Sequence, residues 1–193
     1  MTVVIAVVGS GGKTTRIHQL TEEYRKNNKK VLVTTTTHMY REKGCILSGN
    51  ADEIIEKLEN CGYCMAGLPA EDGKIKALSE DVYEEVCKYA DIVLVEADGS
   101  KGKPVKFPAE HEPVIPKNVN EIHIVTGLRA IGKPVKEVCH RKELVKACLS
   151  ISDDTILTEE HLQILVQKGY VEPLKKQYST VLLNIWLNDY KKI

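Results

Sequence analysis

A glycine-rich segment carries the residue types that bind phosphate. It reads Val-Gly-Ser-Gly-Gly-Lys-Thr-Thr over residues 8–15. Closely spaced glycines let successive backbone N–H groups converge on an anion, Lys13 can neutralise β- and γ-phosphates, and the Thr14 hydroxyl can ligate Mg²⁺. The segment therefore predicts a site for ATP or GTP with Mg²⁺, formed by Gly9, Ser10, Gly11, Gly12, Lys13, Thr14 and Thr15.

The loop is shorter than the usual phosphate-binding pattern. That pattern places a glycine five residues before Gly12, where this chain has Val7, so the loop begins at Gly9 instead. The shortened form resembles the loop of the Mur ligases. A Mur-like ligase that forms an acyl phosphate is not expected, because the extra domains of those enzymes are missing from the sequence. The plainer alternative is a glycine turn followed by a solvated lysine.

Two carboxylates follow an apolar strand at residues 91–95. Glu96 and Asp98 are two apart, so in extended chain their side chains face one way. Ligands of open α/β sheets bind at the carboxyl ends of the strands. We expect Asp98 to hold Mg²⁺ together with Thr14, and Glu96 to act as the base, although little separates the two roles; Lys13, Glu96 and Asp98 are the predicted catalytic residues. The alternative is a pair of solvated carboxylates.

Other polar residues near the same edge have ordinary explanations as well as functional ones. The threonines at 34–37 could sense a γ-phosphate, but β-branched residues also simply favour strands. His38 could donate to a phosphate. Lys101, Lys103 and Lys106 could close over an anionic ligand, whereas solvated loop lysines are the commoner outcome.

Cys61 and Cys64 have the C-x-x-C spacing of zinc and redox sites. Cys139 and His140 could complete four ligands, but nothing in the sequence brings the two pairs together, so zinc is not expected. The six cysteines have irregular spacing, which favours free thiols in a reducing compartment over a disulfide framework.

Composition excludes several classes of protein. The chain has 193 residues, of which 42% are hydrophobic and 28% charged, so a disordered or collagen-like chain is excluded. Basic and acidic residues number 27 each, which makes nucleic acid a poor partner. The longest apolar run, residues 3–8, is too short for a membrane span and lacks a preceding basic segment. We expect a cytoplasmic protein.

The elements that must position the loop follow from hydrophobic periodicity. Continuous apolar runs predict buried parallel strands at residues 3–8, 31–37, 91–95 and 121–125, with a last strand at 180–185. Short strands are possible at 45–47, 63–65 and 74–78. Apolar spacings of three and four predict helices at 14–26, 52–59, 82–90, 140–149 and 158–167. The fold class is therefore α/β: one three-layer domain like that of the P-loop NTPases, with a mostly parallel central sheet, over residues 1–193.

Two details of that prediction concern less regular parts. Residues 98–120 hold four prolines and are expected to form a long ordered loop. Thr158 is a candidate N-cap for the last helix, but His161 stands where a capping box has Glu or Gln, so the box is expected to be incomplete.

Three motifs occur in one order: the glycine loop, the run Thr-Thr-Thr-Thr-His-Met-Tyr at 34–40, and the block Val-Glu-Ala-Asp-Gly-Ser-Lys-Gly-Lys-Pro-Val-Lys-Phe-Pro-Ala-Glu-His-Glu-Pro at 95–113. Together they resemble the YqeC family over about residues 1–135. The resemblance implies an accessory factor in maturation of the selenium-dependent molybdenum hydroxylase cofactor. It implies a nucleotide as ligand, and the hydroxylase or its cofactor-maturation proteins as partners.

Residues 150–193 fit that family less well. Its members continue to a strand ending in an Asn-Lys-x-Asp-like element that could read a base, whereas Asn184 is followed by Ile185 and Trp186. This part is expected to be atypical or truncated, with a short tail at 189–193. The residues leave two functions open: an Mg²⁺-dependent ATPase or GTPase, and a non-catalytic adaptor that binds a nucleotide or pterin dinucleotide.

Overall fold

The computed structural model describes residues 1–189, so of the tail at 189–193 all but Asp189 lies outside the described residues. The chain forms two compact units, each built from separate segments. The chain passes between them within strand β1 (Val3–Gly9), within helix α1 (Lys13–Lys26) and after residues 97, 113 and 121. The first unit comprises residues 1–7, 14–97 and 114–121, and the second comprises residues 8–13, 98–113 and 122 onward.

Parallel strands form the centre of the first unit. Their hydrogen-bonded order is β1, β7 (Ile92–Glu96), β2 (Val31–Thr35) and β4 (Tyr63–Met65), and each of these neighbouring pairs is parallel. Every residue of β2 and β7 is buried, as continuous β-branched runs require when both faces of a sheet are covered. The strands predicted from these runs are confirmed.

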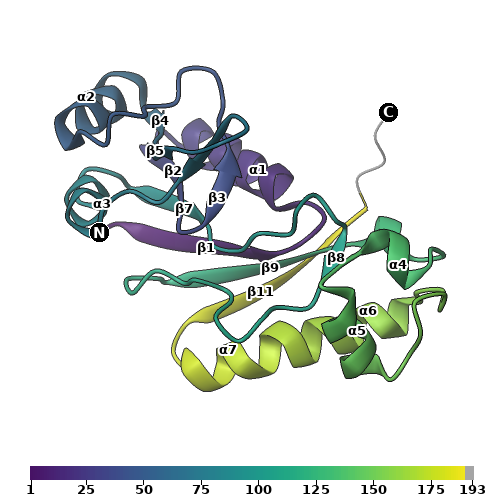
Figure 1. Cartoon of the computed structure of the whole chain (residues 1–193). Helices are drawn as coiled ribbons and strands as arrows, with labels where there is room; N and C mark the ends of the chain where they lie inside the picture. Colours follow the sequence, from purple (N-terminus) through teal and green to yellow (C-terminus); the bar gives the residue numbers. More distant parts are fainter. Residues whose placement is uncertain (190–193) are drawn as a thin grey trace. The chain divides into compact units, whose positions relative to one another are not determined.

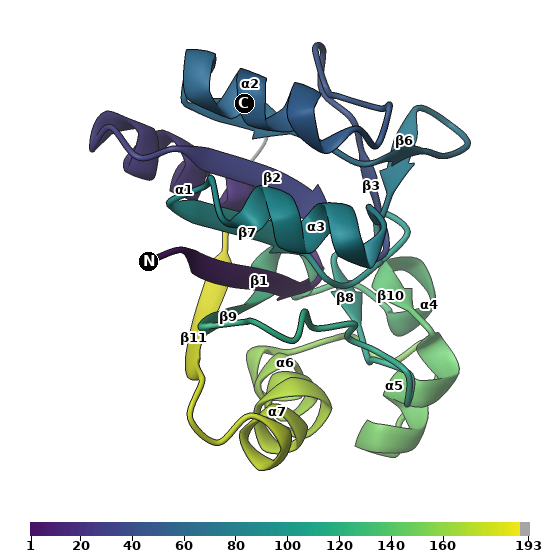
Figure 2. The same cartoon turned by 90° about the vertical axis from the view of Figure 1, so that its left-hand side faces the viewer.

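Helices cover both faces of these strands. Helix α3 (Glu80–Cys87) lies in front of β1 and β7 in Figure 2, and α1 lies behind them. Helix α2 (Ala51–Cys61) begins at Asn50, whose side chain accepts a hydrogen bond from the Glu53 N–H, and ends at Gly62 in the left-handed conformation. The first unit is thus a three-layer arrangement of helices and parallel strands.

A small antiparallel sheet completes the first unit. Its order is β3 (His38–Tyr40), β6 (Lys74–Lys76) and β5 (Leu68–Pro69). The strand predicted to run through the threonines ends earlier, at Thr35, because the Thr37 N–H donates to the Thr35 hydroxyl and turns the chain. The possible strand at 45–47 is reduced to an isolated bridge between Ile46 and Ala66.

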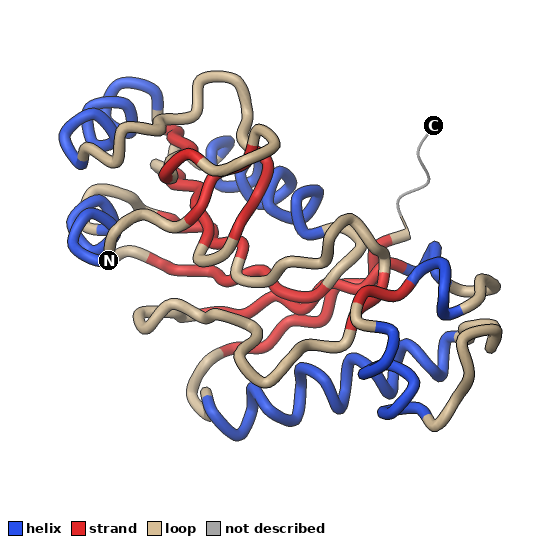
Figure 3. Tube along the Cα trace, in the orientation of Figure 1, coloured by secondary structure: helices blue, strands red, loops and turns tan. Residues whose placement is uncertain are grey.

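The second unit contains strands β9 (Glu121–Gly127) and β11 (Leu182–Asn188), which are neighbours. Helix α6 (Glu159–Val166) continues through a π-helical turn, η2 (Gln167–Val171), into α7 (Glu172–Gln177). Figures 1 and 3 show this long helical segment running along β9 and β11. The shorter helices are η1 (Leu128–Ala130), α4 (Val135–Val138) and α5 (Lys142–Leu149).

An apolar cluster holds these helices together. Val105, Val135, Val145, Leu157 and Leu165 are among its buried members. It is lined by residues three and four apart in α5 and α6, as amphipathic helices require. Burial of each large aliphatic side chain contributes about 1.5–3 kcal/mol.

Two predictions for the second unit were wrong. The stretch 98–120 is not only loop, because β8 (Val105–Lys106) pairs in parallel with β10 (Cys139–His140). The capping box of α6 is complete: the Thr158 hydroxyl accepts from the His161 N–H, and the Thr158 N–H donates to His161 Nδ1. An imidazole nitrogen therefore replaces the usual carboxylate or amide oxygen.

The predicted α/β class with a parallel central sheet is confirmed by the parallel strands of the first unit. None of the helices in residues 1–189 combines the length and apolar character of a bilayer-spanning segment.

Candidate functional site

The glycine loop adopts backbone conformations that only glycine tolerates. The φ angles of Gly9, Gly11 and Gly12 are +90°, +73° and +152°. A Cβ atom added to Gly9 would lie 2.1 Å from the Val125 carbonyl oxygen, and one added to Gly11 would lie 2.5 Å from the Pro104 oxygen. The loop is therefore shaped by backbone packing that excludes every side chain at these positions.

Hydrogen bonds hold the first half of the loop. The Gly9 N–H donates to Asp98 Oδ2 at 3.1 Å, and the Ser10 N–H donates to the Val125 oxygen at 2.9 Å. The Ser10 hydroxyl donates to the Pro104 oxygen at 3.1 Å. Within residues 1–189, the N–H groups of Gly11 and Gly12 make no hydrogen bond. The second half of the loop thus keeps two donors available to a ligand.

Lys13 begins helix α1 directly after these glycines. Its side chain is largely buried, with 6% of the residue exposed, and Nζ donates to the Gly9 carbonyl oxygen at 3.0 Å. The side chain therefore turns back along the loop rather than extending into solvent. The alternative of a solvated lysine is wrong.

Asp98 is fully buried and both of its oxygens have partners. Oδ1 pairs with Lys106, while Oδ2 accepts from the Gly9 N–H and from the Tyr170 hydroxyl, the latter at 2.7 Å. Burial, followed by the negative charge of Asp98, raises the pKa of Tyr170 well above its ordinary value, so the phenol stays protonated and donates. Asp98 thus anchors the first N–H of the loop.

Lys106 joins Asp98 to a second carboxylate. Its Nζ donates to Glu112 Oε2 at 2.8 Å and to the Gly99 oxygen at 2.7 Å, and the side chain is completely buried. Arg141 binds Glu112 with two hydrogen bonds, of 3.2 and 2.9 Å. Two cations and two carboxylates therefore form a neutral ion network, defined here as Asp98, Lys106, Glu112 and Arg141.

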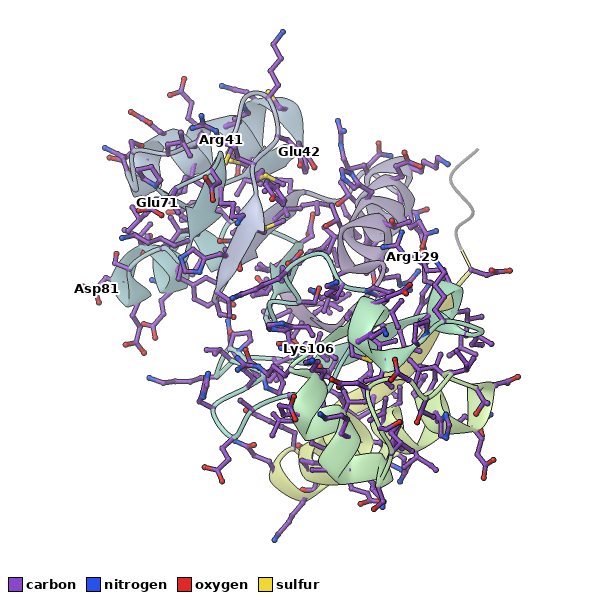
Figure 4. The ribbon with its side chains drawn as sticks, turned by 45° about the vertical axis from the view of Figure 1, so that its right-hand side comes forward. Arg41, Glu42, Glu71, Asp81, Lys106 and Arg129 are labelled. Carbon is purple, nitrogen blue, oxygen red and sulfur yellow. The ribbon has the colours of Figure 1, made fainter. Side chains whose placement is uncertain are left out.

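The pKa of Glu112 reflects this network. Burial by itself raises it, but hydrogen bonds from Arg141, Lys106 and the Ala109 N–H lower the pKa to about 2. Burial and the positive charges of Lys106 and Arg141 lower the pKa of His140, which is opposite Lys106 in the β8–β10 pair. Figure 4 labels Lys106 of β8, which is buried, and Arg129 of η1, which is exposed.

Sequence reasoning missed most of this network. The expectation that loop lysines are solvated was wrong for Lys106. Lys101 is exposed as expected, and Lys103 donates to the Glu137 carbonyl oxygen. Arg141 and Tyr170 gave no signal, because they are 43 and 72 positions from Asp98 and only the fold brings them near it. A short-range signal existed only for Glu112, which lies six residues after Lys106.

Glu96 and Thr14 belong to the first unit. Glu96 ends β7, in register with Val7 of β1 and Thr35 of β2, so it lies at the carboxyl edge of the strands as predicted. Its residue is 7% exposed, and its carbonyl oxygen accepts from the Thr35 hydroxyl at 2.7 Å. Thr14 is exposed and Thr15 half-buried in the first turn of α1. The catalytic and metal roles assigned to these residues stay predictions.

The threonine run has structural contacts. The Thr35 hydroxyl ties β2 to β7, and the Thr36 hydroxyl donates to the Val114 oxygen at 2.6 Å. The Thr34 hydroxyl is buried without a hydrogen bond within residues 1–189. His38 is exposed at the start of β3. These contacts favour the structural interpretation of Thr35 and Thr36.

The six cysteines are free thiols, as predicted. Cys61 is exposed, whereas Cys64 is buried in β4 and burial raises its pKa to about 12. The part of the chain that the structure describes holds no group of three or more His, Cys, Asp or Glu residues suited to a metal.

Comparison with known proteins gives the family. A family described as "YqeC protein" matches residues 5–143, which include the glycine loop, both predicted carboxylates and all four residues of the ion network. The chain belongs to the YqeC family. A YqeC protein of Escherichia coli (strain K12), described as "Uncharacterized protein YqeC", is 31% identical over 178 residues, covering 85% of this chain and 67% of that protein. The YqeC family match ends before Tyr170 and Asn188, which come from the region expected to be atypical.

Proposed function

We propose that this YqeC-family chain binds a nucleoside triphosphate at the glycine loop, ATP in preference to GTP. One observation carries the proposal: the N–H groups of Gly11 and Gly12 have no partner within residues 1–189, in a loop whose shape only glycine permits. Converging N–H donors at a helix N-terminus favour an anion, and the buried ammonium of Lys13 adds a positive charge beside them.

The residues proposed to serve a magnesium ion fit that role in part. The Thr14 hydroxyl is exposed in the first turn of α1, where it is free to ligate Mg²⁺. Glu96 supplies a carboxylate at the strand edge and would position the attacking water or acceptor. Asp98 could become a metal ligand only by releasing Lys106, so its contacts support a role as anchor of the Gly9 N–H. When bound, Mg²⁺ would neutralise charge on the phosphates.

Hydrolysis or phosphoryl transfer would then drive a step in cofactor maturation. The motifs at 8–15, 34–40 and 95–113 support this role through their resemblance to accessory proteins of the selenium-dependent molybdenum hydroxylases. The partner would be the hydroxylase or one of its cofactor-maturation proteins, met in the cytoplasm.

The second candidate is a non-catalytic adaptor, in which the loop binds a nucleotide or pterin dinucleotide without turnover. The ion pair of Asp98 with Lys106 favours it, because that pair occupies one of the two carboxylates expected to do chemistry. The two candidates share the ligand and differ in turnover.

Calorimetric titration with ATP, GTP and ADP, with and without Mg²⁺, tests the binding. Thermal melting measures the stabilisation that the bound nucleotide produces. At a hundred times its Kd, the preferred nucleotide should stabilise the protein by about 2.7 kcal/mol. Lys13→Ala should abolish this gain, whereas Lys26→Ala, at the exposed far end of the same helix, should not. Phosphate release that Glu96→Gln abolishes supports the enzyme, and binding without release supports the adaptor. Nucleotide binding that survives Lys13→Ala would exclude both.

A further inference from the structure

A side chain from the end of the chain contacts the glycine loop. Asn188, the last residue of β11, donates from Nδ2 to the Gly11 carbonyl oxygen at 2.6 Å. A Cβ atom added to Gly12 would lie 2.2 Å from the same nitrogen. The Asn188 amide therefore packs directly against the peptide that joins Gly11 to Gly12.

That contact controls the direction of a donor. In a trans peptide the C=O of one residue and the N–H of the next point in opposite directions. Fixing the Gly11 oxygen toward Asn188 therefore aims the Gly12 N–H away from β11. Without this contact the peptide would be free to rotate, because glycines on both sides of it tolerate many conformations.

We propose that Asn188 is a positioning residue for the polyphosphate of the bound nucleotide. The inference rests on the proposed function, and adds that the affinity of the loop depends on a side chain 177 positions away. Asn188 acts through the Gly12 N–H and does not itself touch the ligand. Because Asn188 acts on an N–H group that faces the phosphates, it should increase the affinity equally for a nucleotide and for a bare polyphosphate.

The test compares Asn188→Ala with Asn184→Ala. Asn184 lies on the same strand, but its amide contacts His123 Nε2 at 3.1 Å, so it controls for general damage to β11. Affinities for MgATP and for inorganic tripolyphosphate are measured by calorimetry. Asn188→Ala should weaken both about tenfold, the effect of losing one net hydrogen bond, while Asn184→Ala should weaken neither. Asn188→Asp keeps the shape without the donor and should weaken both at least as much.

A spectroscopic readout separates positioning from loss of structure. In protein labelled with ¹⁵N-glycine, tripolyphosphate should shift the Gly12 amide resonance of the wild type and of Asn184→Ala, but not that of Asn188→Ala. Wild-type affinity in both Asn188 variants, or tighter binding because the amide had blocked the loop, would overturn the inference and leave the proposed function intact. Failure of the wild type to bind either probe would instead overturn the proposed function, and the inference with it.

Discussion

Lys106 and Asp98 form an ion pair in which neither side chain is exposed to solvent. The other oxygen of Asp98 accepts the Gly9 N–H, so a charge on β8 is linked through one carboxylate to the first residue of the glycine loop. The shape of the loop thus depends on a lysine that lies more than ninety residues further along the chain.

Removing the Lys106 charge should destabilise the protein strongly. Lys106→Met leaves the buried Asp98 without its cation and is expected to lower the free energy of unfolding by about 3–5 kcal/mol. Lys103→Met, which alters an exposed contact to a carbonyl oxygen, should lower it by less than about 1 kcal/mol. Urea unfolding measures both variants. Equal stabilities would show that the ion pair contributes little.

The ion network should make stability depend on pH. The pKa of Glu112 is about 2 in the folded protein, below its ordinary value, so its stabilising effect is complete above about pH 4.5 and is lost as the pH falls toward 2. The melting temperature of the wild type should therefore fall across this range more steeply than that of Glu112→Gln. Glu110→Gln alters an exposed neighbour and should follow the wild type. Parallel curves for all three proteins would contradict the assignment.

Gly9 should tolerate no side chain. Gly9→Ala combines a φ of +90° with a Cβ that would meet the Val125 oxygen, and we expect a loss of about 3 kcal/mol or more in unfolding free energy. Gly102→Ala shares a positive φ, +74°, but its Cβ meets nothing within 4 Å, so it should lose only about 1 kcal/mol. Thermal melting of the two variants compares them. A similar loss in both would mean that φ alone accounts for the effect.

Thr14 should confer dependence on Mg²⁺. If its exposed hydroxyl ligates the ion, Thr14→Ala should remove most of the increase in ATP affinity that Mg²⁺ produces, about tenfold, while binding of metal-free ATP is unchanged. Thr14→Ser keeps the hydroxyl and should restore the increase. Titrations with and without EDTA measure the difference. A Thr14→Ala protein that still responds fully to Mg²⁺ would assign the metal to other ligands.

The parts of the fold predictable from sequence are those with local causes. β1, β2, β7 and β9 follow from continuous apolar runs, and the helices α1, α2 and α3 from apolar spacing, with ends displaced by at most three residues. β11 begins two residues later than predicted and ends three residues later, at Asn188, with the polar Asn184 inside the strand. Its amide is accommodated there by contact with His123.

The candidate site divides in the same way. The glycine loop is predictable because its backbone conformations require residues without side chains, and the glycines can be seen in the sequence. The ion network is not, because burial of Lys106 is favourable only where Asp98 and Glu112 are both within hydrogen-bond distance. Nothing local to Lys106 distinguishes it from Lys101, which is exposed on the same segment.

The wide turn η2 between α6 and α7 determines which face of α7 is turned toward the interior. Gly169, Tyr170 and Val171 are all buried in consecutive positions, which a regular α-helix with one buried face does not provide. In a regular α-helix each residue turns the chain by about 100°, so one additional residue would rotate everything that follows it by that amount. The wider π turn takes up the extra residue locally, so Leu174 of α7 keeps its place in the interior.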